Sequence, residues 1–393
     1  MRVAWLHENF LYWNGGVKYI LEVSRRLKGK CALDVYVTKA SVDNKRIFSQ
    51  AGIEVKEFSN IASDDLRYWI LYPYYIWANT DKLKRLLAEY DVLISSSPTT
   101  SLIAANLDKR TIAIFFEPNG WIYSPTYIKG LPIIQRYLLR GARPFASIYD
   151  KRVMRRADKL VVTDEFTASR GQKIYGRLPE VIYVGVDSEL FTRKRNPALE
   201  ANYAGYDVIL HSATYLNPVK GTRFLIEALP KIVSQVPNCR LLILNPHKDE
   251  KARAELMSLA RSLKVASNIE FLPFIREEDL PYYYSLAKVV VQPSLYESTR
   301  MALVEAAACG TPGVSFSGGS AGEDVVHGET GFIAPMGDTD ALAKMIIKLL
   351  KDRELRQAMG KASRERAKRL FSWDRNSETM WKYIEELVSP RGL

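Results

Sequence analysis

The sequence predicts an α/β protein with two doubly wound parallel sheets. Short apolar strands alternate with amphipathic helices along the whole chain, which is the pattern of a parallel sheet with helical crossovers. The chain has 393 residues, which is too long for one ordinary core and suggests two domains of roughly 150–200 residues. A Gly-rich turn, Gly15-Gly16, follows the first strand, where such domains bind ligands.

The first half contains strand candidates that are short, apolar and rich in β-branched residues. A helix running through Leu27 follows the Gly15-Gly16 turn. The expected strands are Val3–His7, Leu33–Val37, Asp91–Ser96, Thr111–Phe116, and residues 159–163 and 181–186.

The second half repeats this alternation. Its expected strands are residues 208–213, 239–245, 269–272, 289–294 and 312–316. The helix that contains Glu305 ends at Gly310, and Pro312 prevents its continuation. The polar stretch Thr192–Tyr206 is the expected boundary, giving a first domain of residues 1–191 and a second of 207–372, followed by a C-terminal segment of 373–393.

Composition indicates a soluble protein. No uncharged apolar run approaches the roughly 20 residues of a membrane span, and no secretory leader pattern begins the chain. Cys31, Cys239 and Cys309 are scattered, so neither a disulfide framework nor a metal site is expected. We therefore expect a cytoplasmic location.

The formal net charge of +12 is concentrated in residues 129–159, which hold nine Lys or Arg against two Asp. Apolar and aromatic residues are interleaved with this charge, a combination that suits the surface of an anionic membrane. A solvated helix face beside a domain cleft is the alternative. No nucleic-acid partner is expected, since no recognised module is visible.

Arg67–Trp77 is unusually aromatic, RYWILYPYYIW. Such runs usually belong to a core. The alternative is an acceptor groove, because aromatic faces stack on sugars or prenyl chains.

The segment Pro293–Gly331 is the most informative part of the chain. It places Glu297 and Glu305 around the start of a helix that follows a buried strand. A helix N-terminus at a strand's carboxyl end favours an anion. Two carboxylates beside an anion site suit a ligand that carries both phosphates and hydroxyls.

This segment resembles the E-x7-E signature of retaining glycosyltransferases of family 4, which have the GT-B fold of two Rossmann-like domains facing an interdomain cleft. Further segments resemble the family in the expected order: Asn217–Leu229, Ile269–Ser294, Arg155–Phe191 and the turn at Trp13–Gly16. The resemblance implies a metal-independent, retaining glycosyltransferase that needs no cofactor and uses a nucleoside-diphosphate sugar, with UDP- or GDP-sugars preferred. It also implies that the C-terminal helix crosses back to an acceptor-binding first domain.

The resemblance implies a role for each matching donor-site residue. Lys220 corresponds to the phosphate-binding lysine, Glu305 to the carboxylate on the ribose, and Glu297 to the glutamate near the transferred sugar. Gly15 and Gly16, together with a second turn containing Gly319 and Glu323, are further donor-binding candidates.

The chain departs from the family in the loop after Glu297. Ser298, Thr299 and Arg300, followed by Met301, stand where Gly-Phe-Gly is usual, and Thr214 stands where the family has an arginine. We therefore expect Arg300 to supply the diphosphate charge that Thr214 cannot. A surface salt bridge is the alternative.

A second departure lies after residues 111–116. The family often has His-Glu-Pro here, whereas this chain has Phe116-Glu117-Pro118. Glu117 remains an acceptor-side candidate. His7, His211, His247 and His327 are alternatives for the missing histidine, although each is more often structural. His7 is preferred among them, because it is near the Gly15-Gly16 turn.

The sequence therefore predicts transfer of a sugar to a glycan, lipid-linked or small-molecule acceptor. Two other hypotheses stay open: a nucleotide-sugar epimerase on the same fold, and a catalytically weak relative retained as a nucleotide-binding or scaffold subunit. The residues do not select the base, the sugar or the acceptor.

Overall fold

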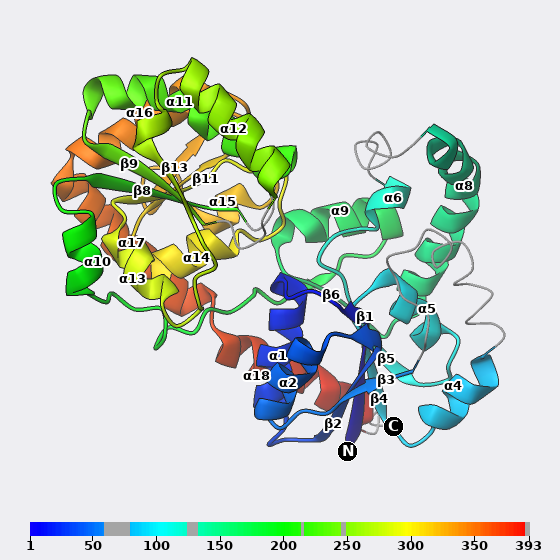
Figure 1. Cartoon of the computed structure of the whole chain (residues 1–393). Helices are drawn as coiled ribbons and strands as arrows, with labels where there is room; N and C mark the ends of the chain where they lie inside the picture. The colour runs from blue at the N-terminus through cyan, green and yellow to red at the C-terminus, as the bar shows by residue number, and fades with distance from the viewer. Residues whose placement is uncertain (59–78, 124–132, 214–215, 245–248, 390–393) are drawn as a thin grey trace. The chain divides into compact units, whose positions relative to one another are not determined.

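The computed structural model describes residues 1–58, 79–123, 133–213, 216–244 and 249–389 (Figure 1). Within them the chain divides into two compact units. Residues 1–184 and 373–393 form the first unit, and residues 185–372 form the second. The segment 185–206, which includes helix α10 (Pro197–Asn202), thus belongs to the second unit.

The first unit contains a seven-stranded sheet in the order β3-β2-β1-β4-β5-β6-β7, and every neighbouring pair is parallel. Its strands are β1 (Arg2–Phe10), β2 (Ala32–Ala40), β3 (Val55–Glu57), β4 (Val92–Ser95), β5 (Arg110–Ile114), β6 (Lys159–Val162) and β7 (Glu180–Val181). Its helices are α1 (Gly15–Leu27), α2 (Val42–Gln50), α4 (Thr80–Leu86), α5 (Pro98–Ala105), α6 (Gly120–Tyr123), α8 (Ile133–Arg156), α9 (Glu165–Tyr175) and α18 (Trp373–Val388).

The second unit contains a six-stranded parallel sheet in the order β10-β9-β8-β11-β12-β13. Its strands are β8 (Asp207–Ser212), β9 (Cys239–Leu244), β10 (Ile269–Leu272), β11 (Val289–Gln292), β12 (Gly313–Phe316) and β13 (Gly331–Ala334). Besides α10, its helices are α11 (Thr222–Gln235), α12 (Glu250–Ser262), α13 (Leu280–Leu286), α14 (Met301–Ala308), α15 (Ala321–Asp324), α16 (Thr339–Lys351) and α17 (Arg353–Leu370), with 3-10 turns at Pro218–Lys220 and Ala266–Asn268.

Helices cover both faces of the second sheet, as Figure 1 shows: α11, α12 and α16 pack together on one face, and α13, α14 and α17 on the other. The strands are buried on both sides, which explains why β11 reads as an unbroken apolar run, Val289–Val291, before Gln292. The expected α/β class with two doubly wound parallel sheets is confirmed.

Each sheet has a topological switch point, where the strand order reverses direction. In the first sheet the reversal lies between β1 and β4, and in the second it lies between β8 and β11. Loops that leave the carboxyl ends of the two strands at such a point diverge and leave a crevice for a ligand. The residues that follow β8 and β11 are therefore the first place to look for a site.

Helix α18 belongs to the first unit. The Trp373 side chain is buried against Tyr19 of α1, with 5.7 Å between ring centroids. The Asn376 amide nitrogen donates to the carbonyl oxygen of Tyr183 at 2.7 Å. The first unit is therefore completed by residues that follow the second unit in the chain.

Candidate functional site

Lys220 lies directly after β8, in a 3-10 turn whose conformation the local sequence dictates. The Asn217 side chain accepts a hydrogen bond from the Lys220 backbone N–H at 3.2 Å. Gly221 ends the turn at φ 71°, a conformation that favours glycine. A Cβ atom at Gly221 would lie 1.9 Å from the carbonyl oxygen of Pro293, so only glycine lets this loop meet the end of β11.

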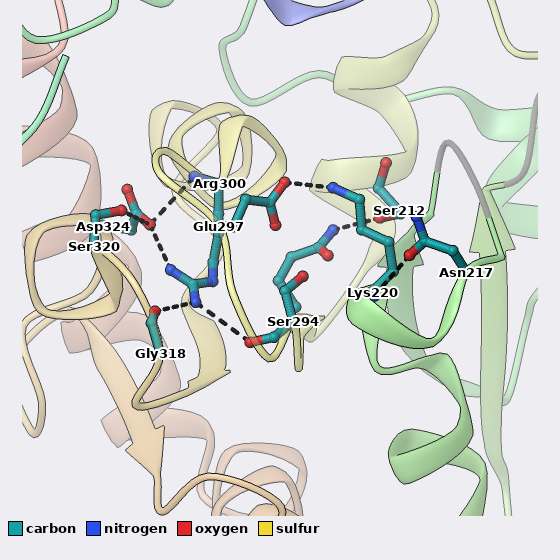
Figure 2. A network of polar contacts seen from close by, with 10 residues as sticks. Ser212, Asn217, Lys220, Ser294, Glu297, Arg300, Gly318, Ser320 and Asp324 are labelled. Carbon is teal, nitrogen blue, oxygen red and sulfur yellow. Dashed lines mark hydrogen bonds and ion pairs between the residues drawn. The ribbon is translucent and has the colours of Figure 1, made fainter. Parts of the chain in front are cut away.

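Glu297 follows β11 in the neighbouring loop. Its Oε1 atom lies 2.5 Å from Nζ of Lys220, and the two side chains are 22% and 25% exposed (Figure 2). The structure thus brings together two predicted site residues that are far apart in the sequence. The pair lies at the switch point between β8 and β11, with both groups open to a ligand from solvent.

His211, on β8, lies close enough to this pair to interact electrostatically with both groups. Its Nδ1 donates to the carbonyl oxygen of Val291 at 2.8 Å, because that oxygen can only accept, and the Thr222 hydroxyl lies 2.9 Å from Nε2. Burial lowers the pKa of His211 to about 4, and the nearby Lys220 ammonium acts in the same direction. His211 is therefore a neutral structural link between β8, β11 and the start of α11.

Glu305 lies in the second turn of α14 and is buried. The Tyr284 hydroxyl of α13 donates to its Oε2 atom at 2.8 Å. Burial, followed by the charge of Glu305, raises the pKa of Tyr284, so the phenol stays a hydrogen-bond donor. Sequence analysis found Glu305 but not Tyr284, which lies in an ordinary aromatic run of a helix.

Arg300 does not lie where the sequence analysis expected it. Its side chain is buried and pairs with Asp324, with 3.1 Å between Nη1 and Oδ2. It also donates to the carbonyl oxygens of Gly318 and Ser294. This geometry counts against the prediction that Arg300 meets a diphosphate, and equally against a surface salt bridge, because the guanidinium has no solvent exposure.

Asp324 is a carboxylate that sequence analysis missed in favour of its neighbour Glu323. Burial raises the pKa of Asp324 to about 7, although Arg300 and the Ser320 hydroxyl favour its charged form. Glu323 itself is partly exposed in the short helix α15 and interacts with neighbouring groups.

The other predicted donor residues of the second unit that the structure describes lie around the start of α14. Ser298, Thr299 and Met301 are partly exposed, and Arg300 is the N-cap. Within the described part of the chain, the Thr299 hydroxyl is buried and has no hydrogen-bond partner. The Gly319 turn packs against the backbone of Glu297.

In the first unit the predicted residues lie in the turns that follow β1 and β5. Gly15 and Gly16 begin α1, whose cap is the Asn14 side chain. A Cβ atom at Gly16 would lie 3.4 Å from the Phe116 ring, so the Gly-rich turn lies beside the turn after β5. Glu117 is exposed there and interacts with neighbouring groups.

Two titratable groups at the end of β1 have strongly shifted pKa values. Burial lowers the pKa of His7 to about 4, and its Nδ1 lies 2.9 Å from the Ser96 hydroxyl after β4. Burial raises the pKa of the adjacent Glu8 to about 8. His7 was a predicted candidate, whereas Glu8 was not.

Three predictions fall outside the described residues: the position of Thr214, the candidate His247 and the aromatic segment Arg67–Trp77. The basic segment is described from Ile133 onward, where it forms α8. Its exposed face carries Tyr137, Phe145, Ile148 and Tyr149 together with Arg140, Arg152, Arg155 and Arg156. Among the residues that the structure describes, none of the helices combines the length and apolar character that a bilayer crossing requires.

Comparison with known proteins identifies both units. Residues 13–190 match the family described as Glycosyltransferase Family 4, and residues 196–366 match the family described as Glycosyl transferases group 1.

Curated relatives carry glycosyltransferase names. The chain is 30% identical over 257 residues to a D-inositol 3-phosphate glycosyltransferase of Saccharomonospora viridis, covering 62% of this chain and 59% of that protein. It is 28% identical over 317 residues to a GDP-mannose-dependent alpha-(1-6)-phosphatidylinositol monomannoside mannosyltransferase of Mycobacterium tuberculosis, covering 75% and 76%. The matched part thus spans less than two thirds of the Saccharomonospora protein.

Solved structures share the fold. Sucrose-phosphate synthase from Thermosynechococcus elongatus superimposes with a TM-score of 0.79 at 19% identity, covering 98% of both chains. The Anabaena protein HepE, solved in complex with UDP, also gives 0.79 at 19% identity, covering 98% of this chain and all of that one. The chain belongs to the group 1, family 4 glycosyltransferases, and its two Rossmann-like units have the GT-B fold.

Proposed function

We propose that this protein transfers a sugar from a nucleoside-diphosphate sugar to an acceptor hydroxyl. The observation that carries the proposal is the juxtaposition of Lys220 and Glu297 at the switch point of the second sheet, directly before the N-terminus of α14. In the reaction, the bond between the anomeric carbon and the diphosphate oxygen breaks, a bond to the acceptor oxygen forms, and the hydroxyl proton is released.

The chemistry of these groups suits a nucleotide sugar. The Lys220 ammonium and the amides that open α14 can stabilise the negative charge that grows on the departing diphosphate. The Glu297 carboxylate can orient sugar hydroxyls or stabilise positive charge at the anomeric carbon. Glu305, held by Tyr284, is available to accept hydrogen bonds from ribose hydroxyls. The sugar is expected to retain its anomeric configuration.

The names of relatives support a UDP- or GDP-sugar as donor. HepE was solved with UDP, and the Mycobacterium tuberculosis relative is named for its dependence on GDP-mannose. The names of the two curated relatives described above both refer to inositol compounds, which supports a small-molecule or lipid-linked acceptor. Glu117 of the first unit is the candidate on the acceptor side.

A thermal-shift panel tests donor binding. A ligand that binds only the folded protein raises the melting temperature, by an amount equivalent to about 2.7 kcal/mol at a hundredfold excess over Kd. We expect UDP or GDP, with the matching nucleotide sugar, to raise it, and the K220A variant to lose the rise. If no nucleoside diphosphate shifts the wild-type protein, the proposal is wrong.

A transfer assay separates the proposal from its rivals. Purified protein with donor alone should neither isomerise the sugar nor release it rapidly, and product should appear when lipid extracts or soluble sugars are added. Isomerisation without acceptor would identify an epimerase. Binding without transfer or donor hydrolysis would identify a nucleotide-binding subunit, a role that the glycosyltransferase names of the relatives do not favour.

We propose in addition that α8 docks on the cytoplasmic surface of an anionic membrane. Phe145 and Ile148 are 77% and 68% exposed on a face that also carries arginines. The acidic residue inside this helix, Asp150, is turned into the unit, where the Tyr123 hydroxyl donates to it at 2.9 Å. The exposed face is thus apolar and positively charged, which fits anionic lipid headgroups above acyl chains.

Vesicle sedimentation tests this docking. We expect binding to vesicles containing phosphatidylglycerol, little binding to pure phosphatidylcholine, and a loss of binding in the F145S/I148S variant. The matched control is V42S, because Val42 is 82% exposed on the same unit outside α8. Equal binding to both lipids, or equal binding by both variants, would exclude this surface.

A further inference from the structure

Arg300 and Asp324 form a buried ion pair between the N-cap of α14 and the short helix α15 of the second unit. Their side chains are 0% and 1% exposed. The Asp324 Oδ2 atom accepts from Nη1 of Arg300 at 3.1 Å and from the Arg300 backbone N–H at 3.2 Å (Figure 2). One carboxylate oxygen therefore holds both the side chain and the main chain of the residue that caps α14.

The same network reaches further along both loops. The Ser320 hydroxyl donates to Asp324 at 3.1 Å, and Nη2 of Arg300 donates to the carbonyl oxygens of Gly318 and Ser294. Ser294 belongs to the loop after β11, whereas Gly318 and Ser320 belong to the loop after β12. The guanidinium thus joins the ends of two neighbouring strands.

The loop after β12 packs against the backbone of the loop that contains Glu297. A Cβ atom at Gly319 would lie 1.9 Å from the carbonyl oxygen of Glu297, and one at Gly318 would lie 2.4 Å from that of Leu295. The Ser320 backbone N–H donates to the Glu297 carbonyl oxygen at 3.2 Å. The backbone of Glu297 is therefore supported by the loop that Arg300 and Asp324 hold in place.

We propose that the Arg300–Asp324 pair is a positioning pair for the donor site: it holds Glu297 and the first turn of α14 in the geometry that the diphosphate sugar requires. The inference rests on the proposed function. The pair acts through Glu297, whose carboxylate meets Lys220, because neither buried side chain can reach a ligand itself. Displacements of about 1 Å at such a site can cost a hundredfold in rate.

A purely structural role predicts a different outcome. Apolar side chains of similar volume often replace a buried ion pair without loss of stability, whereas removal of one partner leaves a buried charge. The double variant R300M/D324L therefore separates stability from positioning. It fills the space of both side chains but removes the hydrogen bonds to Gly318, Ser294 and the α14 N-terminus.

The experiment compares wild type, R300M/D324L and R300K. Melting temperature, kcat, donor KM and the Kd of UDP or GDP by calorimetry are measured for each. We expect the double variant to melt within a few degrees of wild type while its kcat falls by about a hundredfold, with a smaller rise in donor KM. R300K keeps the charge and should recover part of kcat.

Arg364 provides a matched control at the other end of α14. Its guanidinium donates to the carbonyl oxygen of Ala308 at 2.6 Å and to the Thr192 hydroxyl at 2.7 Å. We expect R364M to lower the melting temperature and leave kcat and KM unchanged.

Wild-type kcat in a folded R300M/D324L variant would overturn the positioning role and leave the proposed function intact. If the double variant does not fold, R300K decides: a lowered melting temperature with unchanged kcat would also overturn it. Failure of the wild-type protein itself to bind any nucleoside diphosphate would instead remove the proposed function, and with it this role.

Discussion

Both the backbone and the side-chain ammonium of Lys220 are held by polar contacts. Asn217 fixes its backbone, and the Glu297 carboxylate meets its ammonium at the end of a long side chain. We expect K220A to lower kcat/KM for the donor by about 10²- to 10³-fold, because one cation is removed from the position where diphosphate charge develops. Steady-state kinetics with varied donor measures this loss.

The control for K220A is K231A. Lys231 lies on α11 of the same unit and pairs with Asp340 at the surface. The K231A variant should therefore leave kcat/KM for the donor unchanged. A K220A variant with wild-type kinetics would contradict the assignment of the donor site.

His211 gives the protein an acid-sensitive element. Its pKa is about 4 in the folded protein and 6.5 when unperturbed, so the unfolded chain takes up a proton first as pH falls. The stability that His211 contributes is complete above pH 6.5 and is lost progressively toward pH 4. The whole loss amounts to about 3 kcal/mol.

Urea denaturation between pH 7 and 4.5 measures this effect. H211N should be less stable than wild type at pH 7 but should show a shallower fall on acidification. H327N is the control, because His327 is exposed, and it should follow the wild-type profile. An H211N profile parallel to that of wild type would show that other groups cause the fall.

At the same scale, the sequence singled out Lys220, Glu297 and Glu305, because each lies at a motif position next to a strand or helix end. The structure brings Lys220 and Glu297 together, and the roles of all three residues stay predictions. The sequence misplaced Arg300, gave no signal for Asp324, and indicated His211 only as one of several histidines that are more often structural. Their roles depend on which loops the fold brings together, and a residue's spacing along the chain carries no record of a partner 24 positions away, as with Arg300 and Asp324.

At the scale of elements, the turn between β8 and α11 depends on one glycine. G221A should lower the free energy of unfolding by at least about 1–3 kcal/mol, since it adds left-handed strain and a clash with the Pro293 carbonyl. Urea denaturation measures the loss. The control is G205A: Gly205 also has positive φ, 82°, but open space around it, so only the strain of about 1 kcal/mol is expected. Equal losses of unfolding free energy in G221A and G205A would mean that the backbone around Gly221 shifts to avoid the clash with the Pro293 carbonyl.

The sequence predicted most strands of both sheets, because apolar β-branched runs between turns are distinctive. It did not predict β3 and β13, which are short and weakly patterned, VKE and GFIA. The helix after Lys220 runs to Gln235, beyond the segment that resembles the family, since Pro230 is tolerated inside α11. Tertiary packing on the sheet compensates for the hydrogen bond that this proline cannot donate.

At the scale of the whole molecule, the first unit needs helix α18. W373A should destabilise this unit by about 3–5 kcal/mol, because a buried tryptophan packed on Tyr19 is removed. Calorimetry should show a lower melting temperature for the first unit and an unchanged melting temperature for the second unit. W381A is the control, since Trp381 lies on the same helix but is partly exposed. A uniform shift of both transitions would mean that the units unfold together.

The two points where the chain passes between units lie next to each other. The Val186 backbone N–H donates to the carbonyl oxygen of Phe371 at 3.0 Å, and Val186 pairs with Ser372. The second unit is thus an insertion within the first. A chain that ends at residue 372 therefore contains every residue of the second unit but lacks α18 of the first. Because domains generally fold as units, limited proteolysis of the released 1–372 chain should leave a resistant fragment of about residues 185–372 while the first unit is degraded.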